Sequence, residues 1–211
     1  MKKIKNLFER VDGKIINKIR PSSQWVADGE GIATAKFDGT CCLIKDGKLY
    51  ARYDLKPVKG KGPKYEAGIL IKFCIREDFK TPPEGFIECD DSDMYLGHIM
   101  GWVPVEGNEK FYPYHVNAYD RYDGMRELLR DGTYELVGPK IQGNPHQLTN
   151  LALFKHGDHI LTFEDTPPRD FYKLRSYLFH KDFQWEGIVW HRENGDMVKI
   201  RVRDFKNLTD E

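Results

Sequence analysis

A single lysine directly before an Asp-Gly pair is the part of this chain best suited to covalent chemistry. Residues 35–40 read AKFDGT and lie between two apolar stretches that are typical of strands. Lysine amines are ordinarily protonated at neutral pH, with a pKa of about 10.4, but burial or nearby cations can free them to attack. Gly39 has no Cβ, so the backbone there can approach a phosphate or a nucleoside. Taken alone, the pattern fits an exposed β-turn as well as a site for Lys36 as a nucleophile.

Charged side chains recur later in the chain, within or beside predicted strands. They are Arg52, Glu135, Glu186, and the pair Lys199 and Arg201. Cations neutralise the oxygens of a phosphate, and a carboxylate can hold a divalent metal. Glu186, Lys199 and Arg201 therefore suit a wall for a nucleoside phosphate and its metal, while ordinary charge pairs on an exposed strand face are the alternative.

In this order, the stretches around Lys36, Arg52, residues 134–143, Glu186 and Lys199 resemble nucleotidyltransferase motifs I, Ia, III, IV and V. These motifs define covalent polynucleotide ligases and RNA capping enzymes. The strings GIAT, DGTCC and YELVGPKIQGNP are similar to the small RNA ligase 1 family, and the resemblance covers about residues 29–205. It implies an α+β adenylyltransferase fold, an ATP-grasp-like nucleotidyltransferase domain of antiparallel sheets with peripheral helices and no OB-fold domain.

The resemblance also implies an activity: an ATP-dependent RNA ligase that joins 5′-phosphate and 3′-hydroxyl RNA ends. Lys36 would attack the α-phosphate of ATP and form lysyl-AMP, with Mg²⁺ or Mn²⁺ as cofactor. The AMP would pass to the RNA 5′-phosphate, and the 3′-hydroxyl would then displace it. The partners implied are ATP and RNA ends under repair, with no membrane and no obligate protein partner.

Site roles follow from the resemblance position by position. Lys199 and Arg201 would hold the α-phosphate, and their charge would favour the reactive form of Lys36. Arg52 would contact the ribose or the 5′-phosphate, and Glu135 would accept a hydrogen bond from a ribose hydroxyl. Arg201 departs from the family pattern, in which a second lysine is commoner, but a guanidinium also binds phosphate.

The remaining roles concern the metal, the base and the turn. Glu186 would hold the metal, and Val189 would lie against the purine. Phe154 falls where the family places the aromatic ring that stacks on adenine, with Phe163 as the alternative. Asp38 would orient the loop, and Gly39 would let the nucleotide approach. His146, in the later loop, fits a ligand role or a structural one equally well.

Two hairpins are predicted to position these residues. Asp46-Gly47 separates strands at residues 40–44 and 48–53, and Asn194-Gly195 separates strands at residues 185–190 and 197–202. Further strands are expected at 133–137, 151–154 and 160–163. Helices are expected at 121–130 and after the Thr-Pro-Pro at 166–168, with Phe171, Leu174 and Leu178 facing the core. The whole chain, residues 1–211, is predicted to be one domain with an irregular insertion at 55–115.

The register of the second hairpin can be stated in advance. A two-residue turn at Asn194-Gly195 pairs Trp190 with Lys199 and Ile188 with Arg201. Glu186 would then share a face with Lys199 and Arg201, while Val189 shares the opposite face with Ile200 and Val202. The resemblance instead requires Val189 to face the nucleotide. A bulge at Gly187 or a three-residue turn would reconcile the two.

Composition excludes several classes of protein. The chain has 211 residues, 40% of them apolar, and its longest apolar runs are far shorter than the ~20 residues of a membrane span. The basic N-terminus has no apolar core behind it, so no secretory signal is expected, and the protein is predicted to be cytoplasmic or nuclear. The four cysteines form no C-x-x-C pair, so no structural zinc site is expected. Reduced thiols in an intracellular protein are predicted instead. Net charge is zero, with basic residues concentrated in residues 1–64.

Three alternatives stay open. A capping-type guanylyltransferase or a DNA ligase shares the motifs, but both append an oligonucleotide-binding-fold domain after the last motif, and no such domain is expected here. The third is a catalytically silent nucleotide- or RNA-binding module. Such a module has no use for a nucleophile, so the presence of Lys36, Glu186 and Lys199 argues against it.

Overall fold

The chain is arranged as two compact units, each built on its own sheet. The computed structural model describes residues 4–89, 93–161, 166–180 and 182–206. The first unit comprises residues 40–136 and 151–153, and the second comprises residues 4–39, 137–150 and 154 onward. Mostly antiparallel strands with few, short helices make the fold α+β, as predicted. The prediction of a single domain over residues 1–211 stays a prediction.

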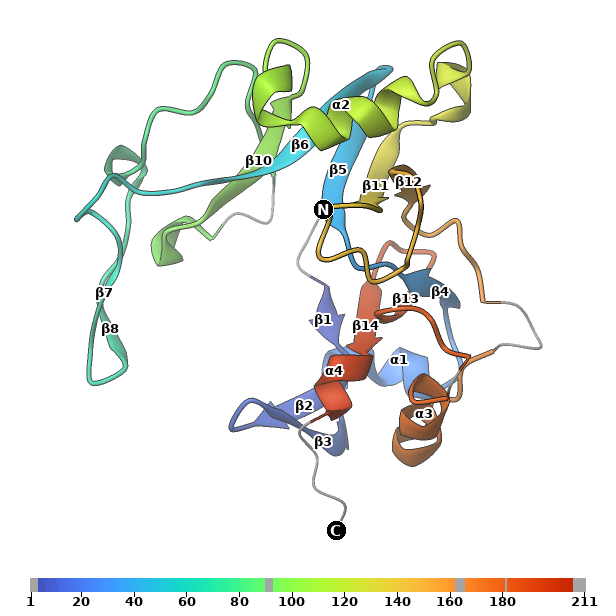
Figure 1. Cartoon of the computed structure of the whole chain (residues 1–211). Coiled ribbons are helices and arrows are strands. Elements are labelled where there is room, and N and C mark those ends of the chain that lie inside the picture. The colour runs from blue at the N-terminus through green and yellow to red at the C-terminus, as the bar shows by residue number, and fades with distance from the viewer. Residues whose placement is uncertain (1–3, 90–92, 162–165, 181, 207–211) are drawn as a thin grey trace. The chain divides into compact units, whose positions relative to one another are not determined.

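A six-stranded sheet, ordered β12-β11-β5-β6-β10-β9, forms the first unit. Its strands are β5 (Thr40–Lys45), β6 (Lys48–Leu55), β9 (Ile87–Glu88), β10 (Ile99–Pro104), β11 (Gly132–Val137) and β12 (Ala152–Lys155). Helix α2 (Pro113–Asp120) lies against β6 (Figure 1). One face of the sheet is buried through Cys42, Ile44, Ala51, Tyr134 and Leu136, which alternate with half-exposed neighbours as a half-buried sheet requires.

The first predicted hairpin is confirmed. Lys45 pairs with Lys48, so the turn has two residues, and Asp46 and Gly47 have φ values of 52° and 67°. A turn with two positive φ values matches the twist of the flanking strands, and an Asp-Gly pair adopts it readily. The strands predicted at 133–137 and 151–154 are also present, as β11 and β12.

Residues 55–115 contain more regular structure than their composition indicates. Among the described residues of this stretch are a hairpin of β7 (Lys64–Glu66) and β8 (Ile69–Lys72), three short 3₁₀ turns, and strands β9 and β10. The 3₁₀ turns are η2 (Arg76–Asp78), η3 (Met94–Leu96) and η4 (Glu109–Phe111). Strand β10 pairs with β6 along its whole length and is mostly buried, so it is an integral strand of the sheet.

The helix predicted at residues 121–130 is wrong. The helix in this region is α2, which begins at Pro113, where the fixed φ of proline suits a first helical position, and ends at Asp120. Gly124 has a φ of 74°, which interrupts any continuation, and only a 3₁₀ turn, η5 (Arg126–Leu128), follows. Leu128, within the predicted helix, is 63% exposed.

The second unit contains a four-stranded sheet, ordered β1-β14-β13-β4 (Figure 1). Its strands are β1 (Lys5–Asn6), β4 (Ile32–Lys36), β13 (Gly187–His191) and β14 (Met197–Arg201). A hairpin of β2 (Phe8–Val11) and β3 (Lys14–Ile19), a 3₁₀ turn η1 (Pro21–Ser23), and the helices α1 (Gln24–Ala27), α3 (Phe171–Leu178) and α4 (Val202–Phe205) complete the unit. Residues 159–161 add to the edge of β4 through backbone bonds from Ala35 to His159 and from Leu161 to Ala33. The rest of the strand predicted at 160–163 lies outside the described residues.

The apolar face of this sheet forms the core of the second unit. Ile188, Trp190 and Ile200 are fully buried there, and Leu174 of α3 packs into the same cluster. Burying a side chain of this size contributes roughly 1.5–3 kcal/mol. Helix α3 is the one predicted from the Thr-Pro-Pro pattern, but its N-cap is Asp170, whose side chain accepts bonds from the backbone of the first turn.

Two predictions from composition can be compared with the structure. None of the four cysteines, all of which lie in the described part of the chain, forms a disulfide, as expected. Within the described part of the chain, no helix has both the length and the apolar character that a membrane span requires.

Candidate active site

The second hairpin differs from the predicted register by one residue. His191 pairs with Met197 and Val189 with Lys199, not Trp190 with Lys199. The loop has three residues, with Arg192 N donating to Asp196 O at 2.9 Å and Gly195 at a φ of 88°. A type I turn followed by a left-handed glycine gives this geometry. The two-residue turn was therefore wrong, and the three-residue alternative is correct.

This register collects the cations of the second unit on one face of its sheet. Lys36 pairs with Gly187, which in turn pairs with Arg201, and Val189 lies between Thr34 and Lys199. Cross-strand partners point to the same side, so Lys36, Val189, Lys199 and Arg201 share a face. Two strand spacings, about 10 Å, separate the backbones of Lys36 and Arg201. The predicted placement of Val189 on the opposite face is wrong, because that face carries Ile188 and Trp190.

Gly187 allows these strands to approach closely at the centre of the site. A Cβ at this position would lie 2.0 Å from the carbonyl oxygen of Ile200 and 2.7 Å from the Cα of Arg201. No side chain fits there without moving β13 away from β14. The glycine of the Glu-Gly pair therefore sets the distance between Lys36 and Arg201.

The side chain of Lys36 is paired with the carboxylate of Glu186. Lys36 Nζ donates to Glu186 Oε2 and to the carbonyl of Phe37 at 3.2 Å. Glu186 is held from both sides, because its N–H donates to Lys36 O and its carbonyl accepts from Val202 N, each at 2.9 Å. Arg203 lies 3.4 Å from the other carboxylate oxygen. The amine of Lys36 and the carboxylate of Glu186 therefore form an ion pair at the end of β4.

Lys199 lies in a strongly cationic environment. Burial lowers its pKa below the ordinary value, and the charges of Arg201 and Lys36 lower it further, with Glu186 and Asp204 partly opposing them. A buried cation held beside two others costs stability unless an anion joins them. The face is therefore suited to a ligand that brings several negative charges, such as a polyphosphate.

Arg201 is fixed by Asp204, a residue that the sequence analysis did not select. Asp204 Oδ1 and Oδ2 accept from the guanidinium of Arg201 at 2.8 and 3.2 Å and from its backbone N–H at 3.0 Å. Asn6 Nδ2 donates to the same carboxylate at 2.8 Å, and Arg10 pairs with it as well. The side chain of Asp204 is 2% exposed. Burial would raise the pKa of Asp204, but the bonds and charges of Arg201 and Arg10 hold it below its usual value.

Replacement of Asp204 by asparagine is expected to reduce stability by about 2 kcal/mol or more, since the charged donors Arg201 and Arg10 lose the negative charge and one of the two acceptor oxygens. The folded pKa lies below the unfolded value of about 3.9, so this stabilisation is complete above pH ~4 and is lost as the pH falls through the folded value. Urea unfolding at pH 7 and pH 3 should show a shallower pH dependence for Asp204→Asn than for wild type. Equal slopes would contradict this assignment.

The Asp-Gly turn is held by a histidine. Asp38 N donates to His146 Nε2 at 2.9 Å, so that nitrogen is unprotonated in this arrangement. The ring of Phe37, between Lys36 and Asp38, is 7% exposed and packs edge-on against His146 at 5.4 Å. Sequence analysis left a ligand role and a structural role open for His146, and this contact to the turn fits the structural role.

Phe154 stacks on a protein ring. Its ring lies parallel to that of Phe37, with 4.3 Å between centroids and 4° between planes. Phe37 therefore occupies one face of Phe154. Phe163, the alternative aromatic residue, lies outside the described residues.

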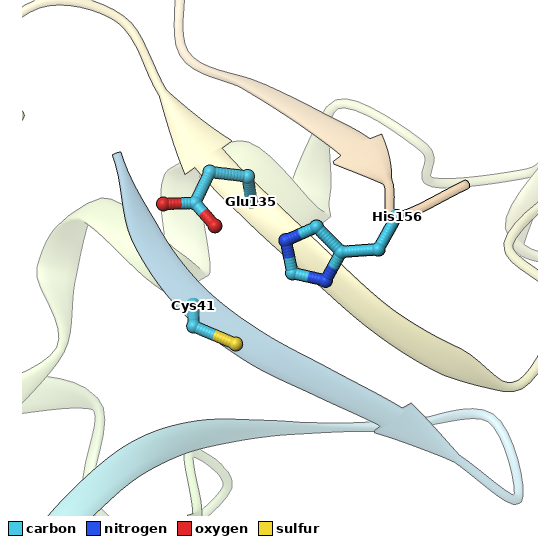
Figure 2. A group of neighbouring side chains, drawn as sticks. All are labelled: Cys41, Glu135 and His156. Carbon is cyan, nitrogen blue, oxygen red and sulfur yellow. The ribbon is translucent and has the colours of Figure 1, made fainter. Parts of the chain in front are cut away.

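Arg52 and Glu135 belong to the first unit and lie on one face of its sheet. Arg52 pairs with Trp102 across the strands, lies 4.9 Å from its ring, and donates to Cys89 Sγ at 3.1 Å. Glu135 pairs with Cys41, and both side chains rise from the same side of β11 and β5 (Figure 2). Burial, then the charge of Glu135, raises the pKa of Cys41 to about 12, with Arg52 opposing. Figure 2 also labels His156, a residue of the second unit.

The structure therefore brings together one group of predicted residues within the second unit. It consists of Lys36, Asp38, Glu186, Val189, Lys199 and Arg201, with Gly39 following Asp38 and Phe154 packed on the turn through Phe37. Asp204 was missed, although an acidic residue three positions after Arg201 at a helix start is a recognisable pattern. Its contacts to Asn6 and Arg10 had no local signal.

Comparison with known proteins places this chain in a family. A family model described as RNA ligase 1 matches residues 7–130 and 124–208. RNA ligase 1 of Mus musculus is 29% identical and that of Pongo abelii 31% identical, in each case over 80% of this chain; RNA ligase 1 of Danio rerio is 28% identical. The chain belongs to the RNA ligase 1 family. It spans 65% of the length of these curated relatives.

Proposed function

We propose that this chain is the nucleotidyltransferase part of an ATP-dependent RNA ligase that joins 5′-phosphate and 3′-hydroxyl ends through lysyl-AMP. The observation that carries the proposal is the amine of Lys36, which pairs with Glu186 and extends from the strand face that also holds Lys199 and Arg201. Family membership supports RNA as the substrate. An adenylyltransferase fold, with α+β sheets presenting these motifs, is part of the same proposal.

In the first step, the nitrogen of Lys36 attacks the α-phosphorus of ATP. A P–N bond forms, the bond from that phosphorus to the bridging oxygen of the β-phosphate breaks, and pyrophosphate leaves with the electron pair. The amine must lose its proton to attack, so the pair with Glu186 describes the resting arrangement. Lys199 and Arg201 neutralise charge on the phosphate oxygens as it develops.

Glu186 is suited to bind a divalent metal ion. It is a carboxylate, 10% exposed, that is held by backbone bonds on both sides and lies beside the nucleophile. A bound Mg²⁺ or Mn²⁺ would supply charge neutralisation at the transferring phosphate. Since Glu186 holds Lys36 in the resting arrangement, binding a metal there would also release the amine.

The other proposed contacts concern the nucleoside. Val189, on the same face as Lys199, would lie against the purine, and the ring of Phe154 would stack on it. Arg52 and Glu135 would contact ribose or phosphate oxygens, and Gly39 after Asp38 leaves room for the nucleotide. The lysyl-AMP would pass its AMP to the RNA 5′-phosphate, and the RNA 3′-hydroxyl would then displace AMP.

Labelling in a denaturing gel tests the proposal. The protein is incubated with α-³²P-ATP or α-³²P-GTP and either Mg²⁺ or Mn²⁺, without RNA. Label from ATP that resists denaturation is the expected result, since the phosphoramidate is covalent. Label from GTP would favour a capping-type guanylyltransferase, and absence of label a silent binding module. Sealing of 5′-phosphorylated RNA with a DNA control then separates RNA ligase from DNA ligase.

A further inference from the structure

A hollow in the second unit adjoins the site but is not part of the strand face that carries Lys199. It has a volume of about 600 Å³ and opens where β4 and β14 end and β13 begins. Asp38 and Glu186 line it on the side of the site, and Trp185, Gln184, His146 and Gln147 line it elsewhere. We call this hollow the Trp185 pocket.

The lining of the Trp185 pocket suits an uncharged ring better than a phosphate. Among the described residues that line it, none is a lysine or arginine, whereas three are carboxylates: Asp38, Asp182 and Glu186. A free polyphosphate would be repelled there. An aromatic ring and side-chain amides are the groups that stack on a nucleobase and bond its edge, and the volume is within the range of small-molecule sites.

The ring of Trp185 is already held in place. It meets Phe37 and His159 edge-on, with centroids 5.1 and 4.7 Å away. It also lines a second pocket of about 470 Å³, on the side of His159, Tyr177 and His180. The ring is half-buried and fixed by neighbours, and a base that stacks on such a platform orders few protein groups on binding.

We propose that the Trp185 pocket binds the terminal nucleoside of an RNA end, with its base stacked on Trp185. The proposal rests on the proposed function, because it assigns the pocket to the second substrate of the same site. Val189, where the adenine of ATP is proposed to lie, does not line the pocket, so both nucleosides can be bound together. Glu186 lines the pocket and pairs with Lys36, which places the bound nucleoside next to the reacting centre.

Photocrosslinking tests the occupant directly. A 5′-phosphorylated RNA with 4-thiouridine at its 3′ end, its 5′ end or an internal position is irradiated with the full chain, and fragmentation spectra locate the adduct. Crosslinks from a terminal thiouridine to Trp185 or its neighbours Gln184 and Phe183 are expected, and the two terminal arms tell which end is bound. Adducts only elsewhere, or equal adducts from the internal position, would overturn the proposal. A crosslink of 8-azido-ATP to Trp185 would also overturn it.

Variants provide a second test through RNA affinity, measured by fluorescence anisotropy without ATP. Trp185→Ala is expected to raise the Kd for RNA ends by about ten-fold or more, and Gln184→Ala by a smaller factor. His180→Ala, which lines the neighbouring pocket only, should leave the Kd unchanged. Unchanged affinity in folded Trp185→Ala contradicts the proposal. If that variant does not fold, Gln184→Ala and the crosslinks decide.

These readouts separate this inference from the proposed function. If ATP leaves no covalent label but terminal thiouridine reacts with Trp185, the ligase mechanism fails and the RNA site stands. If ATP labels the chain but terminal RNA does not reach Trp185, the ligase mechanism stands and the assignment of the pocket fails.

Discussion

Replacement of Lys36 by arginine should abolish labelling by ATP while the protein stays folded. A guanidinium can keep the ion pair with Glu186 and a bond to the carbonyl of Phe37, so the local charge balance survives. It cannot supply the neutral nucleophile, because arginine is effectively always protonated. The expected label is below one thousandth of wild type, a loss of the covalent step rather than a weakening of it.

Lys36→Ala should lose the label too, but with a different effect on stability. The carboxylate of Glu186, only 10% exposed, would be left with Arg203 as its ionic partner. We therefore expect a lower melting temperature for Lys36→Ala than for Lys36→Arg. Lys18→Ala, in an exposed pair with Glu9, serves as the control and should change neither quantity. Wild-type labelling of either Lys36 variant would place the nucleophile elsewhere.

The two hairpins show what local sequence can and cannot determine. At Asp46-Gly47, both turn residues adopt positive φ values, and the loop length follows from the pair itself. Asn-Gly at 194–195 fits a two-residue turn and also the end of a three-residue loop. The choice between them came from burial, because only the observed register puts Ile188, Trp190 and Ile200 into one core.

That signal was present in the sequence. The apolar residues that face the core, Ile188 and Trp190 in one strand and Val198 and Ile200 in the other, fall at even positions. Matching them requires an odd number of loop residues. A two-residue turn would pair Trp190 with Lys199. It would therefore place the Trp190 ring, which is fully buried in the structure, on the charged face. Burial of Ile188, Trp190 and Ile200, rather than the identity of the turn residues, predicts the observed register and the observed face for Val189.

Short helices, and contacts between residues far apart in the chain, are harder to predict from the sequence. Helix α2 has eight residues, begins at Pro113 and ends at Asp120. It is too short to show a sustained helical spacing of apolar residues in the sequence. The contacts of Asp204 to Asn6 and Arg10 join residues almost two hundred positions apart. Motif spacing selected Lys36, Lys199 and Arg201, which lie on strands β4 and β14 of one sheet. Asp204, which holds Arg201, and its partners Asn6 and Arg10 come from other elements and were not predicted.

Replacement of Lys199 by alanine should reduce ATP labelling by about 10²–10³-fold without reducing stability. Lys199 lies beside Arg201 and Lys36, and burial together with their charges already lowers its pKa. Without a ligand, this cation is therefore unfavourable, and its removal relieves repulsion in the folded state. In the proposed reaction with ATP, the same charge would stabilise the transferring phosphate, and loss of one such group typically costs 10²–10³ in rate.

The measurement compares the rate of labelling with the melting temperature in the same preparations. We expect Lys199→Ala to melt at or above the wild-type temperature, a pattern typical of residues kept for function at some cost in stability. Lys18→Ala again provides the control for removing one positive charge from the second unit. A Lys199→Ala variant that labels normally, or that loses label only because it unfolds, would contradict a role at the phosphate. Retained stability with lost labelling would tie the cationic face of β4, β13 and β14 to chemistry rather than to folding.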